Sequence, residues 1–145
     1  MSQVEYWTGA HTTHRLRYHL VWIPKYRKRV LQGKVAFRLK GLFYEACSMN
    51  DWWIDDLAIL PDHIHMLIQL PPSISVAEAI QYLKGGTSKV IRKEYPELQE
   101  FLWGDSFWCD GYFAESVGRL NDVAIKKYIR NQFASMPGKD RNPGL

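Results

Sequence analysis

Apolar and polar residues alternate along several short stretches of this chain, and this period of two predicts β-strands. The clearest stretch runs from Arg15 to Ile23, and Phe107 to Val117 forms another. Two more strands, from Trp52 to Leu60 and from His63 to Leu70, are separated only by Pro61-Asp62. Because this link is so short, we expect the two strands to pair as an antiparallel hairpin.

Apolar residues recur three or four positions apart in three other stretches, which predicts helices. The first spans about Leu31 to Met49. The second opens at Ser75, where Glu78 three residues later completes a capping box. The third begins at Asn121 and runs to about Phe133. The predicted order is therefore β-α-β-β-α-β with one additional helix.

This order predicts an α+β fold of the ferredoxin-like (RRM-like) type, a four-stranded antiparallel sheet with two helices on one face. The additional C-terminal helix then has only the open face of a sheet to pack on, its own or a partner's. A chain of 145 residues that is 46% hydrophobic suits one compact domain. We expect that domain at 1–135 and a disordered, Pro- and Gly-containing tail at 136–145.

Composition changes this picture only modestly. The net charge of +4 is a mild bias toward polyanionic partners. Cys47 and Cys109 are too few for a disulfide framework or a zinc knuckle. The N-terminus lacks the apolar core of a signal peptide, and no apolar run approaches the roughly 20 residues that cross a bilayer. We expect a soluble, cytoplasmic protein without a membrane segment.

The most informative residues are His63 and His65. Side chains two apart in a strand point to the same face, and Ile64 and Met66 then face the helices. Two imidazoles so placed can share one divalent cation. Two solvated histidines without a ligand are the alternative. Asp62 is placed either to orient an imidazole or to form the turn.

Tyr128 and Gln132 are four residues apart and therefore share one face of the last helix. If this helix covers the open sheet face, Gln132 can supply a carbonyl oxygen as a third ligand. Nitrogen and oxygen ligands without thiolate suit Mg²⁺ or Mn²⁺. Tyr128 would then be a nucleophile, whose phenol needs a cation or a base nearby. Alternatively, Tyr128 closes an edge of the core.

Five runs carry a resemblance to a known family: Tyr18-His19-Leu20-Val21-Trp22, Lys25-Tyr26-Arg27, Pro61-Asp62-His63-Ile64-His65-Met66-Leu67, Leu83-Lys84-Gly85 and Lys127-Tyr128-Ile129-Arg130-Asn131-Gln132. In order and spacing they resemble the IS200/IS605-family transposases, which are single-tyrosine members of the HUH endonuclease superfamily. The resemblance covers roughly residues 14 to 133. It identifies the predicted domain as an HUH transposase domain.

The resemblance implies a DNA transposase that cleaves and rejoins single-stranded DNA at the ends of an insertion sequence. The tyrosine, here Tyr128, becomes linked to the 5′ phosphate and leaves a free 3′ hydroxyl. The ligands of the divalent metal would be His63, His65 and Gln132. Such enzymes recognise imperfect DNA hairpins near the element ends.

The resemblance also implies a homodimer whose sheets join across the interface. The tyrosine helix can reach into the partner's histidine site, so both placements of Tyr128, within its chain or across the dimer, stay open. Gly118 stands where the family often has a pair of glycines that act as a hinge, with Arg119 at the second position.

Basic residues are the candidates for DNA binding, because Lys and Arg contact phosphates and position DNA without reading its sequence. Ordinary solvated charges are the alternative. Tyr26 and Trp108 offer faces for base stacking, with a core position as the alternative. The basic candidates are Arg15, Arg17, Lys25, Arg27, Lys28, Arg29, Lys84, Lys89, Arg92, Lys93, Lys126 and Lys127.

Three other functions are compatible with parts of this pattern. A domesticated relative would process chromosomal hairpins with the same chemistry. A non-catalytic RRM-like nucleic-acid-binding module would share the fold, but it would present aromatic residues on its central strands, where this chain has His63 and His65. A simple metal-dependent hydrolase would not need Tyr128.

Overall fold

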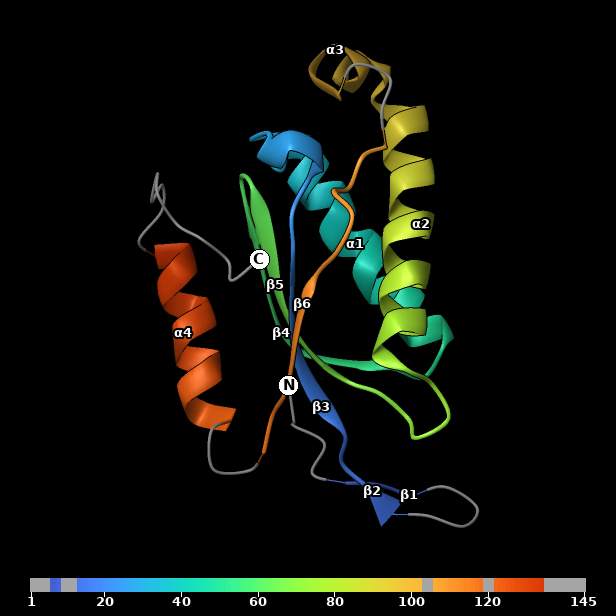
Figure 1. Cartoon of the computed structure of the whole chain (residues 1–145), viewed down its shortest axis with the longest axis vertical. Helices are drawn as coiled ribbons and strands as arrows, with labels where there is room; N and C mark the ends of the chain where they lie inside the picture. Colours follow the sequence, from blue (N-terminus) through green and yellow to red (C-terminus); the bar gives the residue numbers. More distant parts are fainter. Residues whose placement is uncertain (1–5, 9–12, 103–105, 119–121, 135–145) are drawn as a thin grey trace.

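The computed structural model describes residues 6–8, 13–102, 106–118 and 122–134 of the chain. Its centre is a four-stranded antiparallel sheet in the order β4-β5-β3-β6 (Figure 1). This order confirms the ferredoxin-like arrangement, in which the first and third of the four strands lie in the middle. The strands are β3 (Arg17–Trp22), β4 (Trp53–Leu60), β5 (His63–Gln69) and β6 (Phe113–Ser116).

Helices cover both faces of this sheet. The helices α1 (Gly33–Met49) and α2 (Val76–Glu94) lie on one side, and α4 (Asp122–Ala134) lies on the other (Figure 1). The additional helix therefore packs on the sheet of its own chain. No helix in the described part of the chain is long and apolar enough to cross a membrane. The smaller elements are β1 (Trp7–Thr8), β2 (Thr13–His14), η1 (Lys25–Arg27), η2 (Pro96–Leu98) and α3 (Gln99–Leu102).

Every residue of β5 is buried, because both faces of this strand are covered. On the α1–α2 side, Ile64 and Met66 belong to the main hydrophobic cluster together with Phe43. On the α4 side, Leu67 packs in a second cluster that includes Ile129 of α4. The period-two pattern thus predicts the two faces of β5 correctly.

The start of α2 has the capping box that the sequence predicts. The Ser75 hydroxyl accepts a hydrogen bond from the backbone N–H of Glu78, and the Glu78 carboxylate accepts one from the backbone N–H of Ser75. Such a capping box satisfies two backbone donors that the first helical turn leaves without partners. It also orients α2 where the chain leaves the sheet.

The last strand is shorter than predicted, because the chain departs from the sheet before Phe113. Gly111 has a left-handed φ of 87°, and the Lys84 ammonium donates to the carbonyls of Cys109 and Gly111. These carbonyls are therefore bound to a side chain of α2 and not to a neighbouring strand. Trp108 pairs only as an isolated bridge with Pro24.

Other predicted boundaries also shift, and two predictions lie outside the described residues. The first predicted strand keeps only Arg17–Trp22. The first helix begins at Gly33, since the backbone N–H of Leu31 donates to the carbonyl of Pro61 and Gln32 is extended. Neither the expected cap Asn121 nor the expected tail 136–145 belongs to the described part of the chain.

Candidate active site

His63 and His65 lie side by side on the face of β5 that α4 covers. Their ring centroids are 5.0 Å apart, and the residues are 2% and 1% exposed. The sequence predicts the shared face correctly. It does not predict that the two side chains are buried, because a histidine pair on an open sheet would be solvated, whereas this pair lies beneath a helix.

Asp62 orients the first of these rings. Its Oδ1 accepts a hydrogen bond of 2.7 Å from His63 Nδ1, and its Oδ2 lies 3.0 Å from Arg27 Nε. The carboxylate therefore connects the basic segment after β3 to the histidine. With Nδ1 donating to Asp62, His63 presents Nε2 as the nitrogen for a cation, the arrangement typical of metal-bound histidines.

His19 lies in hydrogen-bond contact with the second ring, a contact that the sequence analysis missed. His19 Nε2 lies 3.0 Å from His65 Nδ1, and the two ring planes are nearly parallel, at 12°, with centroids 5.3 Å apart. His19 is itself only 6% exposed. A signal was present, since His19 falls on the polar side of the alternation in β3. The strand order was needed to bring that side against His65.

The environment of these rings favours neutral imidazoles. Burial, with contributions from His63 and His19, lowers the pKa of His65 to about 3. Burial also lowers the pKa of His19, against the opposing effect of the Glu115 carboxylate. A neutral imidazole retains a lone pair, which protonation would remove and which a metal ion requires.

The donor set fits a divalent cation in part. His65 Nε2 is buried and has no hydrogen-bond partner among the described residues. Two adjacent imidazoles with such a nitrogen suit a divalent transition ion or Mg²⁺ when oxygen ligands join them. No group of three His, Cys, Asp or Glu side chains in the described ranges is arranged to hold a metal. A third ligand of another type is therefore needed.

Tyr128 lies over this cluster from α4. Its ring centroid is 5.4 Å from that of His65 and 6.2 Å from that of His19, both in T-shaped contacts, and the residue is 42% exposed. Ile129, fully buried, anchors the helix. Gln132 follows Tyr128 by about one helical turn in α4, and its side chain is outside what the structure describes. Gly118 is exposed after β6, ahead of α4.

All the predicted DNA-binding residues except Arg15 and Arg17 fall into three groups. Lys126 and Lys127 directly precede Tyr128 on α4. The segment around η1 is connected to His63 through Arg27 and Asp62. The structure does not bring α2 to this site, because α2 covers the opposite face (Figure 1). The residues on α2 are Lys84, Lys89, Arg92 and Lys93; those at or after η1 are Lys25, Arg27, Lys28 and Arg29; Arg15 precedes β3.

The prediction that Arg17 contacts DNA requires a correction. Its guanidinium is 1% exposed and forms an ion pair of 2.8 Å with Asp55, which also accepts from Gln69. A side chain enclosed in this way does not present its charge to DNA. Lys84 likewise holds the backbone before β6, and Trp108, 4% exposed, is a core residue that donates to Thr87.

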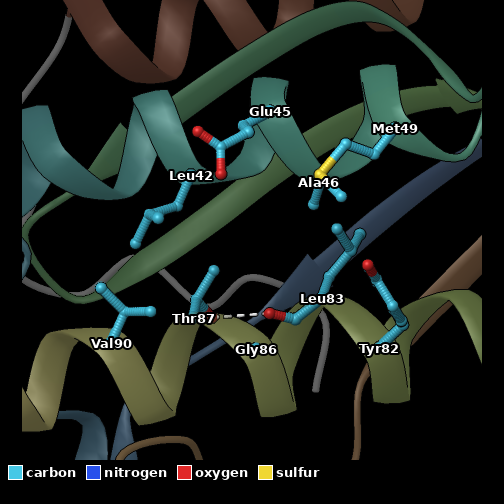
Figure 2. Close-up of a pocket in the computed structure, with 9 residues that line it drawn as sticks. All are labelled: Leu42, Glu45, Ala46, Met49, Tyr82, Leu83, Gly86, Thr87 and Val90. Carbon is cyan, nitrogen blue, oxygen red and sulfur yellow. Dashed lines mark hydrogen bonds between the residues drawn. The ribbon is translucent and has the colours of Figure 1, made fainter.

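A surface groove between α1 and α2 is distant from this site. Figure 2 shows that Met49 of α1 lines it, together with Tyr82 and Gly86 of α2. It lies on the side of the sheet opposite α4. The candidate site is a buried histidine cluster under α4, on the other side of the sheet from this groove.

Comparisons with known proteins agree with this fold. Residues 12–132 match the family described as "Transposase IS200 like". The ISDra2 transposase TnpA of Deinococcus radiodurans is 33% identical over 124 residues, which are 86% of this chain and 89% of that protein. The transposase for insertion sequence element IS200 of Salmonella typhimurium is 33% identical over 123 residues, 85% of this chain and 80% of that protein.

Two solved structures are also similar. A candidate transposase from Deinococcus radiodurans R1 superposes with a TM-score of 0.71 at 30% identity, covering 86% of this chain and 96% of that one. A REP-associated tyrosine transposase bound to a REP hairpin has a TM-score of 0.60 at 13% identity, covering 89% and 69%. The second likeness is one of fold.

Fold and sequence together identify the class as a DNA transposase, an enzyme that cuts and joins DNA strands. The chain belongs to the IS200-like transposase family. This membership decides against a non-catalytic RRM-like module.

Proposed function

We propose that this transposase cleaves and rejoins single-stranded DNA through a phosphotyrosine on Tyr128, with His63, His65 and Gln132 as ligands of Mg²⁺ or Mn²⁺. The observation that carries the proposal is the contact of the Tyr128 ring with the buried, neutral His65. This contact brings a phenol, which is a weak nucleophile at neutral pH, next to imidazoles that can hold a cation.

The reaction exchanges one phosphodiester for another. Tyr128 Oη attacks the scissile phosphorus, the bond from phosphorus to O3′ breaks, and the leaving O3′ takes up a proton. The 5′ phosphate is then esterified to Tyr128. In the second step a 3′ hydroxyl of another strand attacks this phosphate and releases the phenol. A bound divalent cation would supply charge neutralisation at the phosphate and favour the phenolate.

We expect the DNA substrate to carry a hairpin. Support comes from the family membership and from the basic segment at η1, which is joined to His63 through Arg27 and Asp62. We also expect a homodimer. Light scattering with and without hairpin DNA measures its mass, and a monomeric mass under both conditions would contradict this expectation.

The decisive experiment is covalent capture. Labelled single-stranded hairpin DNA is incubated with the protein and Mn²⁺ and resolved on a denaturing gel. We expect an adduct that Tyr128→Phe abolishes. Tyr82→Phe is the matched control, since Tyr82 is similarly exposed, at 47%, on the opposite side of the sheet. Cleavage that persists in Tyr128→Phe would exclude the tyrosine mechanism.

The metal role has its own test. We expect His63→Ala and His65→Ala to lose Mn²⁺ binding and cleavage while they retain hairpin binding in a gel-shift assay. Circular dichroism of the metal-free variants checks the fold. A different result would contradict the metal role: both histidine variants fail to fold, and Asp62→Asn binds Mn²⁺ with the affinity of the wild type. The histidines would then be structural residues.

A further inference from the structure

We infer that His19 is a positioning residue for the metal site: it accepts a hydrogen bond from His65 Nδ1 and thereby leaves the lone pair of His65 Nε2 for the cation. The inference rests on the proposed function, in which His65 is a ligand. It concerns a residue on another strand, 46 positions away in the sequence, that would not touch the metal.

The contact is well defined. His19 Nε2 and His65 Nδ1 are 3.0 Å apart, the two rings are nearly parallel at 12°, and both residues are buried. At this distance one nitrogen carries the hydrogen and the other accepts it. Two arrangements are therefore available, and they have opposite consequences for a metal ion.

If His19 donated, neutral His65 would carry its own hydrogen on Nε2. That nitrogen is buried without a hydrogen-bond partner among the described residues. A buried N–H without an acceptor is rarer and more costly in proteins than a buried acceptor without a donor. Donation by His65 Nδ1 is therefore favoured, and it leaves Nε2 with a lone pair.

The sheet supplies a reason for the hydrogen of His19 to lie on Nδ1. β3 runs between β5 and β6, and Glu115 of β6 is directly opposite His19 in the register. The Glu115 carboxylate therefore acts electrostatically on His19 from the β6 side. A negative charge on the side of His19 away from His65 stabilises an N–H there.

The two candidate metal ligands, His63 and His65, then share one hydrogen-bonding arrangement. His63 Nδ1 donates to the Asp62 carboxylate, and His65 Nδ1 donates to the His19 imidazole. An acceptor behind each ring fixes its orientation and its tautomer, and loss of such a partner typically weakens metal binding by about 10–100-fold.

The first test uses metal-free protein with ¹⁵N-labelled histidine. Two-bond ¹H–¹⁵N spectra distinguish the two neutral tautomers of each ring. We expect both His65 and His19 to carry the hydrogen on Nδ1. A spectrum in which His65 carries it on Nε2 would overturn the inference, whatever the enzyme does with DNA.

The second test measures Mn²⁺ affinity by titration calorimetry. His19→Leu removes the acceptor, and we expect about 10–100-fold weaker binding. His19→Gln can return an oxygen near the original Nε2 position, and we expect it to recover most of that loss. His14→Leu, a histidine of β2 outside the cluster, is the control.

The outcomes separate the two hypotheses. Equal Mn²⁺ affinity in wild type, His19→Leu and His19→Gln would overturn the role of His19 and leave the proposed metal site intact. If the wild type itself binds no Mn²⁺, the proposed metal site fails, and the role of His19 fails with it. Equal loss in His19→Leu and His19→Gln, with both variants folded, would also contradict an acceptor role.

Discussion

Tyr128 and His65 meet in a T-shaped contact within one chain, with ring centroids 5.4 Å apart and planes inclined at 83°. The tyrosine therefore reaches the histidine cluster without a second subunit. The same contact helps to keep His65 at 1% exposure. In the proposed mechanism the phosphodiester lies between Tyr128 and a cation held by His65, so we expect α4 to shift away from the sheet when DNA binds.

The anchoring of α4 gives the first prediction. Ile129 is fully buried against Leu67 and Leu60 on the sheet, so Ile129→Ala should cost about 2–5 kcal/mol of packing. We expect faster hydrogen exchange in α4, with α1 unchanged. Ile129→Val is the milder control, at about 0.5–1.5 kcal/mol. An equal rise in exchange across α1 and α4 would show that α4 does not open separately.

The buried ion pair gives the second prediction. Arg17→Met leaves the Asp55 carboxylate without its main counter-charge, and breaking such a pair costs about 3–5 kcal/mol. Urea denaturation measures this loss. We expect the double variant Arg17→Met/Asp55→Leu to recover part of it. At urea concentrations where the Arg17→Met variant is still folded, its affinity for hairpin DNA should equal that of the wild type. A loss of hairpin affinity in the folded variant would instead support Arg17 as a DNA contact.

The position of the basic residues gives the third prediction. Arg29 is exposed after η1, near the segment that Arg27 joins to Asp62, whereas Lys89 is exposed on α2 across the sheet. Each phosphate contact contributes about one to the slope of log affinity against log salt. We expect Arg29→Ala to reduce the slope by about one and Lys89→Ala to leave it unchanged. The reverse result would assign hairpin binding to α2.

The fourth prediction concerns Cys47, which is 2% exposed in α1. Burial raises the pKa of its thiol from 9.0 to about 12. Above pH 9 the unfolded chain loses this proton while the folded chain keeps it, so stability falls as pH rises from 9 toward 12. The slope is at most about 1.4 kcal/mol per pH unit.

Urea denaturation under reducing conditions at pH 8 and pH 10 tests this prediction. We expect the wild type to lose stability relative to Cys47→Ala between the two pH values. Cys109, which is partly exposed, supplies the control variant Cys109→Ala, whose pH dependence should match that of the wild type. Parallel curves for all three proteins would mean that Cys47 ionises equally in both states.

Local interactions let the sequence determine much of this protein by itself. Alternation along β5 determines that His63 and His65 share a face, because side chains two apart in a strand project together. The Ser75–Glu78 box is contained within four residues and appears as predicted. The element order and the short Pro61-Asp62 link define the ferredoxin-like class. Only the family resemblance gave Tyr128 a definite role.

Tertiary structure alone decided the contacts between distant residues. His19 meets His65, and Arg17 meets Asp55, only because β3 pairs with β5 in a particular register and β4 lies beyond it. Whether a histidine is solvated or buried depended on where α4 packs, and the sequence left both its own sheet and a partner's open. Register and helix docking are set by the packing of the whole core, so no local pattern contains them.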